Sequence, residues 1–110
     1  MELYHQKGLI LRIYVREEDR LEGKALYKKL IDMAKEFGLT GVTVFRAIAG
    51  YGPSRKIRTL SFADLSSNLP IMLEIVDTEE KIKAFLLNIN EKIKHGLITI
   101  QEIFIIKNVP

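Results

Sequence analysis

The chain has 110 residues, of which 47% are hydrophobic and 28% are charged, and its net charge at neutral pH is +3. A chain of this length and composition is expected to fold as one globular domain, residues 1–110, and is too apolar to be disordered. The small positive surplus does not indicate a nucleic-acid partner. The lack of cysteine excludes disulfides, thiolate metal sites and cysteine nucleophiles. We therefore expect a cytoplasmic protein.

The first part of the chain predicts a strand followed by a helix. Residues 8–16 alternate as a strand does, and one face carries Leu9, Leu11, Ile13 and Val15. An acidic turn at residues 17–19 then leads into residues 23–37, whose apolar side chains recur at helical spacing. Gly38 is suited to end this helix.

The second part repeats this order on the far side of a long connection. Residues 42–49 are rich in β-branched and aromatic side chains and predict a second strand. Residues 71–76 predict a third strand, with Pro70 suited to its first position. Asp77 or Thr78 can cap a second helix that runs through to Gly96. Residues 99–107 predict the last strand.

This order predicts an α+β fold, a ferredoxin-like βαββαβ sandwich with a four-stranded antiparallel sheet. Both helices would cover one face of the sheet. A solvated opposite face should alternate cleanly between apolar and polar residues, yet the strands keep apolar residues on both sides. These include Ile10, Tyr14, Met72, Val76, Phe104 and Ile106.

We expect another copy of the chain to cover that second face, because no further predicted element remains to do so. Isolated charges would pair within or around the contact. They are Arg12, Arg46, Glu74 and Glu102. The alternative is a half-exposed sheet with scattered apolar residues on its surface.

The long loop at residues 50–68 is the candidate functional element. Hairpin loops usually need two to five residues, and closing one this long costs about 2 to 3 kcal/mol more than a tight turn. Its glycines let the backbone approach an anion, and its cations can hold phosphate or carboxylate oxygens. The predicted ligand-binding residues are Gly50, Tyr51, Gly52, Arg55, Lys56 and Arg58. The alternative is a solvated basic turn, because the third glycine of a dinucleotide fingerprint is missing.

Other candidate sites have simpler explanations. His95 follows the second predicted helix, where the helix dipole stabilises a cation, and it is far in sequence from His5, the only other histidine. The acidic residues 17–19 could serve acid–base chemistry, but a solvated turn explains them better. The serines lack a nucleophile-elbow context. We therefore predict no catalytic residue, no metal and no cofactor.

Four segments resemble the PII-like proteins classed as Domain of Unknown Function 190. They are DRLEGKALYKKLI at residues 19–31, GVTVFRAIAGYG at 41–52, LPIMLEIVDTEEKI at 69–82 and GLITIQEIFII at 96–106. The resemblance implies a ferredoxin-like subunit that assembles as a homotrimer around its open sheet faces. It also makes residues 50–68 the counterpart of the PII T-loop, which docks on transporters and enzymes.

The resemblance has further implications for ligand and partner. PII proteins hold ATP or ADP between subunits, using the base of this loop and a glycine-rich, lysine-bearing turn before the last strand. The corresponding turn here, residues 94–97, has one glycine. Members of the similar family are often encoded beside fluoride-exporter-type membrane proteins, so the resemblance makes a membrane transporter the candidate partner.

The residues and the resemblance together predict a non-enzymatic, trimeric PII-like regulator. A small anionic ligand, with an adenine nucleotide as the candidate, would bind at the cleft between subunits, order the loop and change its affinity for a protein partner. Two alternatives remain open. One is a small ferredoxin-like enzyme acting on an anionic metabolite, and the other is a nucleic-acid-binding module that uses the sheet face.

Overall fold

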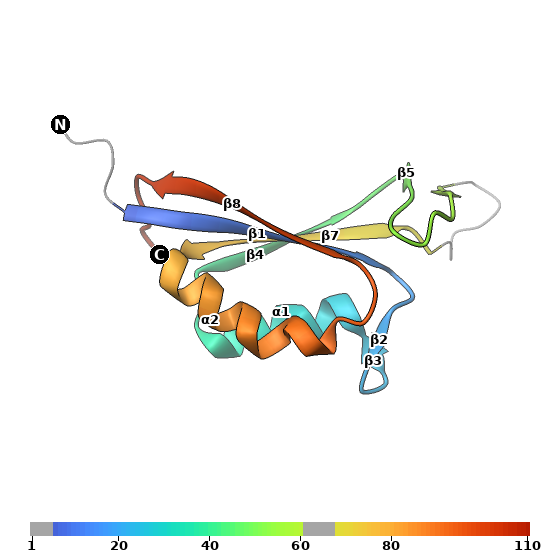
Figure 1. Cartoon of the computed structure of the whole chain (residues 1–110), viewed down its shortest axis with the longest axis horizontal. Helices are drawn as coiled ribbons and strands as arrows, with labels where there is room; N and C mark the ends of the chain where they lie inside the picture. Colours follow the sequence, from blue (N-terminus) through green and yellow to red (C-terminus); the bar gives the residue numbers. More distant parts are fainter. Residues whose placement is uncertain (1–5, 61–67) are drawn as a thin grey trace.

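The computed structural model of the chain describes residues 6–60 and 68–110. Its main sheet has four antiparallel strands in the order β4-β7-β1-β8. They are β1 (Gln6–Arg16), β4 (Gly41–Arg46), β7 (Pro70–Thr78) and β8 (Leu97–Ile105). Helices α1 (Leu26–Phe37) and α2 (Glu79–Ile89) both lie on one face of this sheet (Figure 1). The predicted ferredoxin-like α+β fold is confirmed.

The core lies between the two helices and the sheet. The odd-numbered residues of β1 and β7 from Leu9 to Val15 and from Ile71 to Ile75 are buried there, because successive strand side chains point to opposite faces. The helices contribute apolar stripes, and the ring of Phe85 meets that of Phe37 edge-on at 5.4 Å between centroids. The buried helix residues are Leu26, Leu30, Ala34, Ile82, Phe85 and Ile89.

The helix boundaries differ in part from the prediction. The hydroxyl of Thr78 accepts a bond from the backbone N–H of Lys81 at 3.3 Å, so Thr78 is the N-cap of α2. Gly38 ends α1 in the left-handed conformation, as predicted. The expectation that the second helix runs to Gly96 was wrong. It ends at Ile89 and is followed by a single 3₁₀ turn, η1 (Asn90–Lys92).

The first helix begins three residues later than predicted because a small hairpin precedes it. Strands β2 (Arg20–Leu21) and β3 (Lys24–Ala25) pair across a two-residue turn. Both turn residues, Glu22 and Gly23, have positive φ, as the tight turns that suit hairpins require. This hairpin uses the residues that the sequence pattern assigned to the first helical turn.

The long connection between β4 and β7 is confirmed, and its first part is itself a hairpin. β4 ends at Arg46, and the N–H of Ala47 donates to the carbonyl of Pro70, where β7 begins. The chain then forms a separate ladder from β5 (Ala49–Gly50) and β6 (Arg58–Thr59), beyond the end of the main sheet (Figure 1). Residues 61–67 of the predicted loop lie outside the described residues.

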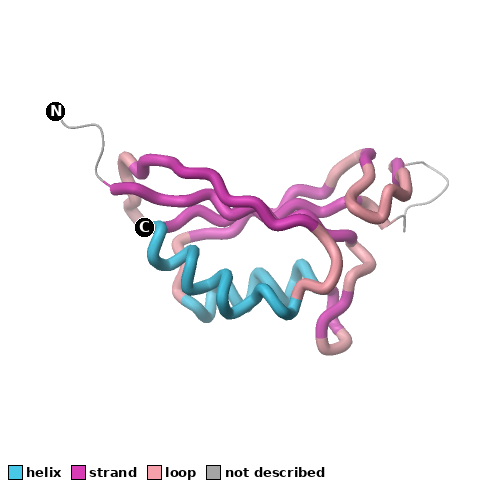
Figure 2. Tube along the Cα trace, viewed as in Figure 1, coloured by secondary structure: helices cyan, strands magenta, loops and turns pink. Residues whose placement is uncertain are grey.

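The second face of the sheet has no helix over it within the described parts of the chain (Figure 2). Its side chains are the even-numbered residues of β1 and β7, which include the predicted Ile10, Tyr14, Met72 and Val76. The placement of Phe104 on this face was wrong. Phe104 is paired with Lys7 and therefore shares the face that the helices cover. Ile106 follows the end of β8.

The isolated charges of the strands are paired within the chain. On the open face Arg12 lies 3.2 Å from Glu74. Elsewhere Arg46 binds Glu17 at 2.9 Å and Glu102 binds Lys7 at 3.1 Å.

Among the described residues, neither helix has the length and apolar character needed to cross a bilayer.

Candidate functional site

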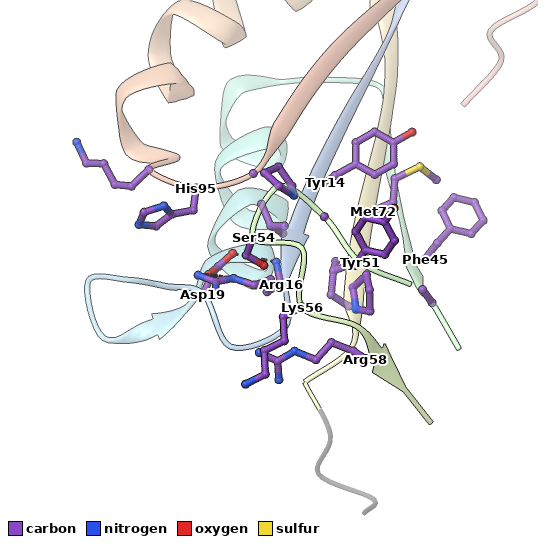
Figure 3. Close-up of a pocket in the computed structure, with 18 residues that line it drawn as sticks. Tyr14, Arg16, Asp19, Phe45, Tyr51, Ser54, Lys56, Arg58, Met72 and His95 are labelled. Carbon is purple, nitrogen blue, oxygen red and sulfur yellow. Dashed lines mark hydrogen bonds and ion pairs between the residues drawn. The ribbon is translucent and has the colours of Figure 1, made fainter. Parts of the chain in front are cut away.

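A cavity of about 810 Å³ lies at the end of the sheet where β1 finishes and β7 begins. The hairpin of β5 and β6 forms another wall, and the turn before β8 closes the remaining side (Figure 3). Segments that are far apart in the sequence therefore meet in one place. They are residues 14–16 with Asp19, parts of 45–58, residues 70–72 and residues 94–96.

One wall of the cavity is an apolar strip on the open face of the sheet. Phe45 of β4 pairs with Met72 of β7, and Met72 pairs with Tyr14 of β1. The ring of Tyr51, from the hairpin, lies on the same side of the cavity (Figure 3). This wall suits a flat apolar group. It also makes the cavity continuous with the uncovered sheet face.

The opposite wall is positively charged. Arg16, Lys56 and Arg58 lie together away from the ring of Phe45 (Figure 3), and Lys94 also lines the cavity. Among the described residues that line the cavity, Asp19 is the one that carries a carboxylate. Within residues 6–60 and 68–110, Lys56 and Lys94 take part in no ion pair. The cavity therefore attracts anions.

The acidic turn at residues 17–19 binds arginines, so the prediction of a solvated turn was wrong. Glu17 accepts two bonds from Arg46, at 2.9 and 3.1 Å. Asp19, whose side chain is only 10% exposed, accepts two from the guanidinium of Arg16, at 3.0 and 2.7 Å. The hydrogen bond to Asp19 raises the pKa of Arg16 above its ordinary value. Each carboxylate is thus held in a fixed position by a cation.

Glu18 connects two parts of the long loop. Its Oε1 lies 2.7 Å from Nη2 of Arg58, and its Oε2 accepts a bond from the side-chain amide of Asn68 at 3.2 Å. The side chain of Arg58 is 19% exposed. Its Nε is buried and has no hydrogen-bond partner among the described residues. Arg58 therefore keeps an unused donor beside the cavity.

The structure brings together four of the six ligand-binding residues predicted from sequence. Tyr51, Gly52, Lys56 and Arg58 line the cavity. Gly50 and Arg55, although both are described, lie outside its lining. Gly50 has a φ of 150° and pairs with Arg58 across the hairpin, so it positions that arginine. Arg55 has a φ of 63° and closes the turn by donating its N–H to the carbonyl of Gly52.

The turn before β8, which the resemblance had pointed to, was left out of the predicted ligand-binding residues. Lys94, His95 and Gly96 all line the cavity. The prediction that His95 is a cation at a helix end was wrong, because it lies three residues beyond the last residue of η1. The apolar strip was also missed as part of the site. The signal for the turn was the family resemblance, which places a ligand-binding segment before the last strand.

Metal binding finds no support in the arrangement of the described side chains. Within residues 6–60 and 68–110, no three His, Asp or Glu side chains form a group that could hold a metal ion. His5 lies outside the described residues.

Comparison with known proteins identifies relatives over nearly the whole chain. Residues 8–105 match the family described as DUF190, Uncharacterized ACR. A UPF0166 protein of Aquifex aeolicus is 50% identical over 91% of this chain and 94% of its own length. A UPF0166 protein of Methanocaldococcus jannaschii is 41% identical over 92% of this chain and 94% of its own length.

Solved structures with the same fold are more distant in sequence. CPII of Thiomonas intermedia K12, a nitrogen regulatory PII-like protein bound to ADP, AMP and bicarbonate, superposes with a TM-score of 0.68 at 16% identity over 92% of this chain and 90% of CPII. The GlnK–ATP complex of B. subtilis gives 0.51 at 18% identity, over 88% of this chain and 82% of GlnK. The fold of this chain is therefore PII-like, as the resemblance in sequence implied.

Proposed function

We propose that this chain, which belongs to the DUF190 family, is a non-enzymatic PII-like regulatory protein that binds an adenine nucleotide in the cavity at the base of residues 50–68. The single observation that carries the proposal is the division of the cavity into an apolar wall and a cationic wall. The volume of about 810 Å³ is within the range of small-molecule sites, which is roughly 300 to 1,000 Å³.

The apolar wall suits the base of an adenine nucleotide, and the cationic wall suits its phosphates. The strip of Tyr14, Met72 and Phe45 offers aromatic and thioether surface to a planar base. Lys56 and Arg58 lie where phosphate oxygens can receive charge-assisted bonds. The buried Nε of Arg58, which has no partner in the described part of the chain, supplies one such donor. ADP and ATP in the PII-like structures support this choice of ligand.

The same apolar wall supports a site that is completed by a neighbouring subunit. Tyr14 and Met72 belong both to the cavity and to the open sheet face. A second copy that covered this face would therefore also cover the cavity and exclude water from the bound base. The family resemblance makes the assembly a homotrimer in this proposal.

Residues 50–68 are the element that reports occupancy to a protein partner, which in this proposal is a membrane transporter. The loop enters and leaves beside the cavity, at the hairpin of β5 and β6 and at the start of β7. A ligand held between the hairpin and the sheet can change the loop only if it binds one loop conformation better than another. The cytoplasm is the compartment in which we expect the protein to bind its ligand and its partner.

Calorimetry with ADP tests the proposal. The purified protein should bind ADP, and Arg58→Ala together with Lys56→Ala should weaken binding by about 100-fold, because two charge-assisted contacts are removed. Arg55→Asn is the matched control, since it removes a loop cation outside the cavity and asparagine tolerates the positive φ of that position. The control should bind as the parent does. No binding of ADP, ATP or AMP by the parent protein would refute the proposed function.

A further inference from the structure

The carboxylate of Glu18 already pairs with Arg58, one of the cations that line the cavity. Its Oε1 lies 2.7 Å from Nη2 of Arg58, at the distance of a strong charge-assisted bond. Glu18 does not line the cavity as the described residues form it, so it contacts Arg58 from outside. A phosphate inside the cavity and the carboxylate outside it would draw on the same guanidinium.

A second contact of Glu18 reaches the end of the long loop. Its Oε2 accepts a bond from Asn68 at 3.2 Å. One carboxylate therefore joins Arg58, at the middle of the long connection, to Asn68, near its end. Arg16 lies 3.6 Å from the same Oε1 and remains as a partner for Glu18 if Arg58 turns away.

We propose that Glu18 and the anionic part of the ligand compete for Arg58, so that ligand binding releases the carboxylate link between Arg58 and Asn68. This inference rests on the proposed function, because it takes the cavity as the ligand site. Glu18 is a positioning residue here and does not touch the ligand. It lowers the affinity for the ligand and couples occupancy to the loop.

The geometry favours displacement of Glu18 from Arg58 by the ligand over binding of both anions to Arg58 at once. An arginine presents its donors in a rigid planar fork, and Glu18 engages Nη2 while Nε stays without a partner among the described residues. Two anions close to one guanidinium also repel each other. A ligand that gains both donors must therefore displace the carboxylate or bind more weakly beside it.

The test measures ADP affinity by calorimetry in a double-mutant cycle. Glu18→Gln keeps the size of the side chain and removes its charge, and it should tighten ADP binding by about three- to fivefold, which is the range of a partly exposed ion pair. In an Arg58→Ala background the same change should have no effect, because the cation in dispute is gone. Glu102→Gln is the charge-matched control. Glu102 lies beside Lys7, its side chain is 75% exposed, and it should not alter affinity.

A second readout follows the guanidinium itself. The ¹⁵N resonance of the Arg58 Nε should move when ADP binds to the parent protein, and Glu18→Gln should move it toward the bound position without ligand. Unchanged or weaker ADP binding by Glu18→Gln, while the parent and Glu102→Gln bind equally, would overturn the competition but leave the proposed function intact. A parent protein that binds no nucleotide would overturn both.

Discussion

Gly96 lies against the backbone of Tyr14 so closely that a Cβ at position 96 would overlap the carbonyl oxygen of Tyr14. Gly96 also has a φ of 136°, a backbone conformation that residues with a Cβ rarely adopt. This contact brings the turn of Lys94 and His95 against the end of β1. Gly96 therefore permits the close approach by which that turn reaches the cavity.

We predict that Gly96→Ala lowers the free energy of unfolding by about 2 kcal/mol, the cost of backbone strain at a position that cannot relax freely. Gly41→Ala is the control, because a Cβ there meets no atom within 4 Å, and it should stay within about 0.5 kcal/mol. Urea unfolding of both variants gives the comparison. Equal stability of the two would contradict the close contact.

The second prediction concerns the core beneath the sheet. Phe85 is fully buried and packs against Phe37, whereas Leu87 on the same helix is 86% exposed. Phe85→Ala should cost about 3 to 5 kcal/mol through lost burial and a residual cavity, and Leu87→Ala should cost little. A loss for Leu87→Ala as large as that for Phe85→Ala would mean that α2 presents a different face to the sheet.

The third prediction concerns the open face. Ile10 is half-buried on β1, lies on that face beside Val76, and does not line the cavity. Ile10→Lys should convert the proposed homotrimer into single subunits, because a buried unpaired charge between copies is costly. Light scattering coupled to gel filtration measures the mass, and Leu87→Lys on the helical side is the control. A parent protein that runs as single 12.6 kDa subunits would exclude the assembly.

The fourth prediction is a dependence of stability on pH. Bonds from Lys83 and then from Lys7 lower the pKa of Glu79 below its usual value of 4.5. The stabilisation is therefore present above the unfolded pKa and is lost as the pH falls through the folded pKa. Glu79→Gln should lose less stability than the parent between pH 6 and pH 3, measured by urea midpoints. Glu80→Gln, which removes a neighbouring acid that forms no ion pair with the described residues, should follow the parent.

Much of the fold could be read from the sequence because it depends on local patterns. The alternation in β1, the apolar stripes of both helices and the position of Pro70 at the start of β7 each act over a few residues. The hairpin at residues 20–25 was missed because its turn, Glu22 and Gly23, lies within a segment that also fits a helix.

The site was harder to read because it depends on contacts between distant segments. Glu17 and Arg46 are 29 positions apart, and Glu18 and Arg58 are 40 apart. No local pattern distinguishes such acids from solvated ones, so residues 17–19 were misinterpreted. Lys56 and Arg58 could be singled out because the loop cations cluster in sequence, although Arg55 of the same cluster lies outside the lining. Tyr14 and Met72 join the cavity only through the register of β1 and β7.

The strand order also sets how the chain must fold. β1 lies between β7 and β8, and Tyr14 pairs with Leu97, 83 positions later. The first strand therefore keeps one unpaired edge until the last strand arrives, which slows folding and leaves an edge open to association with other chains. During synthesis the cavity would be among the last features to form, since its final wall is the turn that leads into β8.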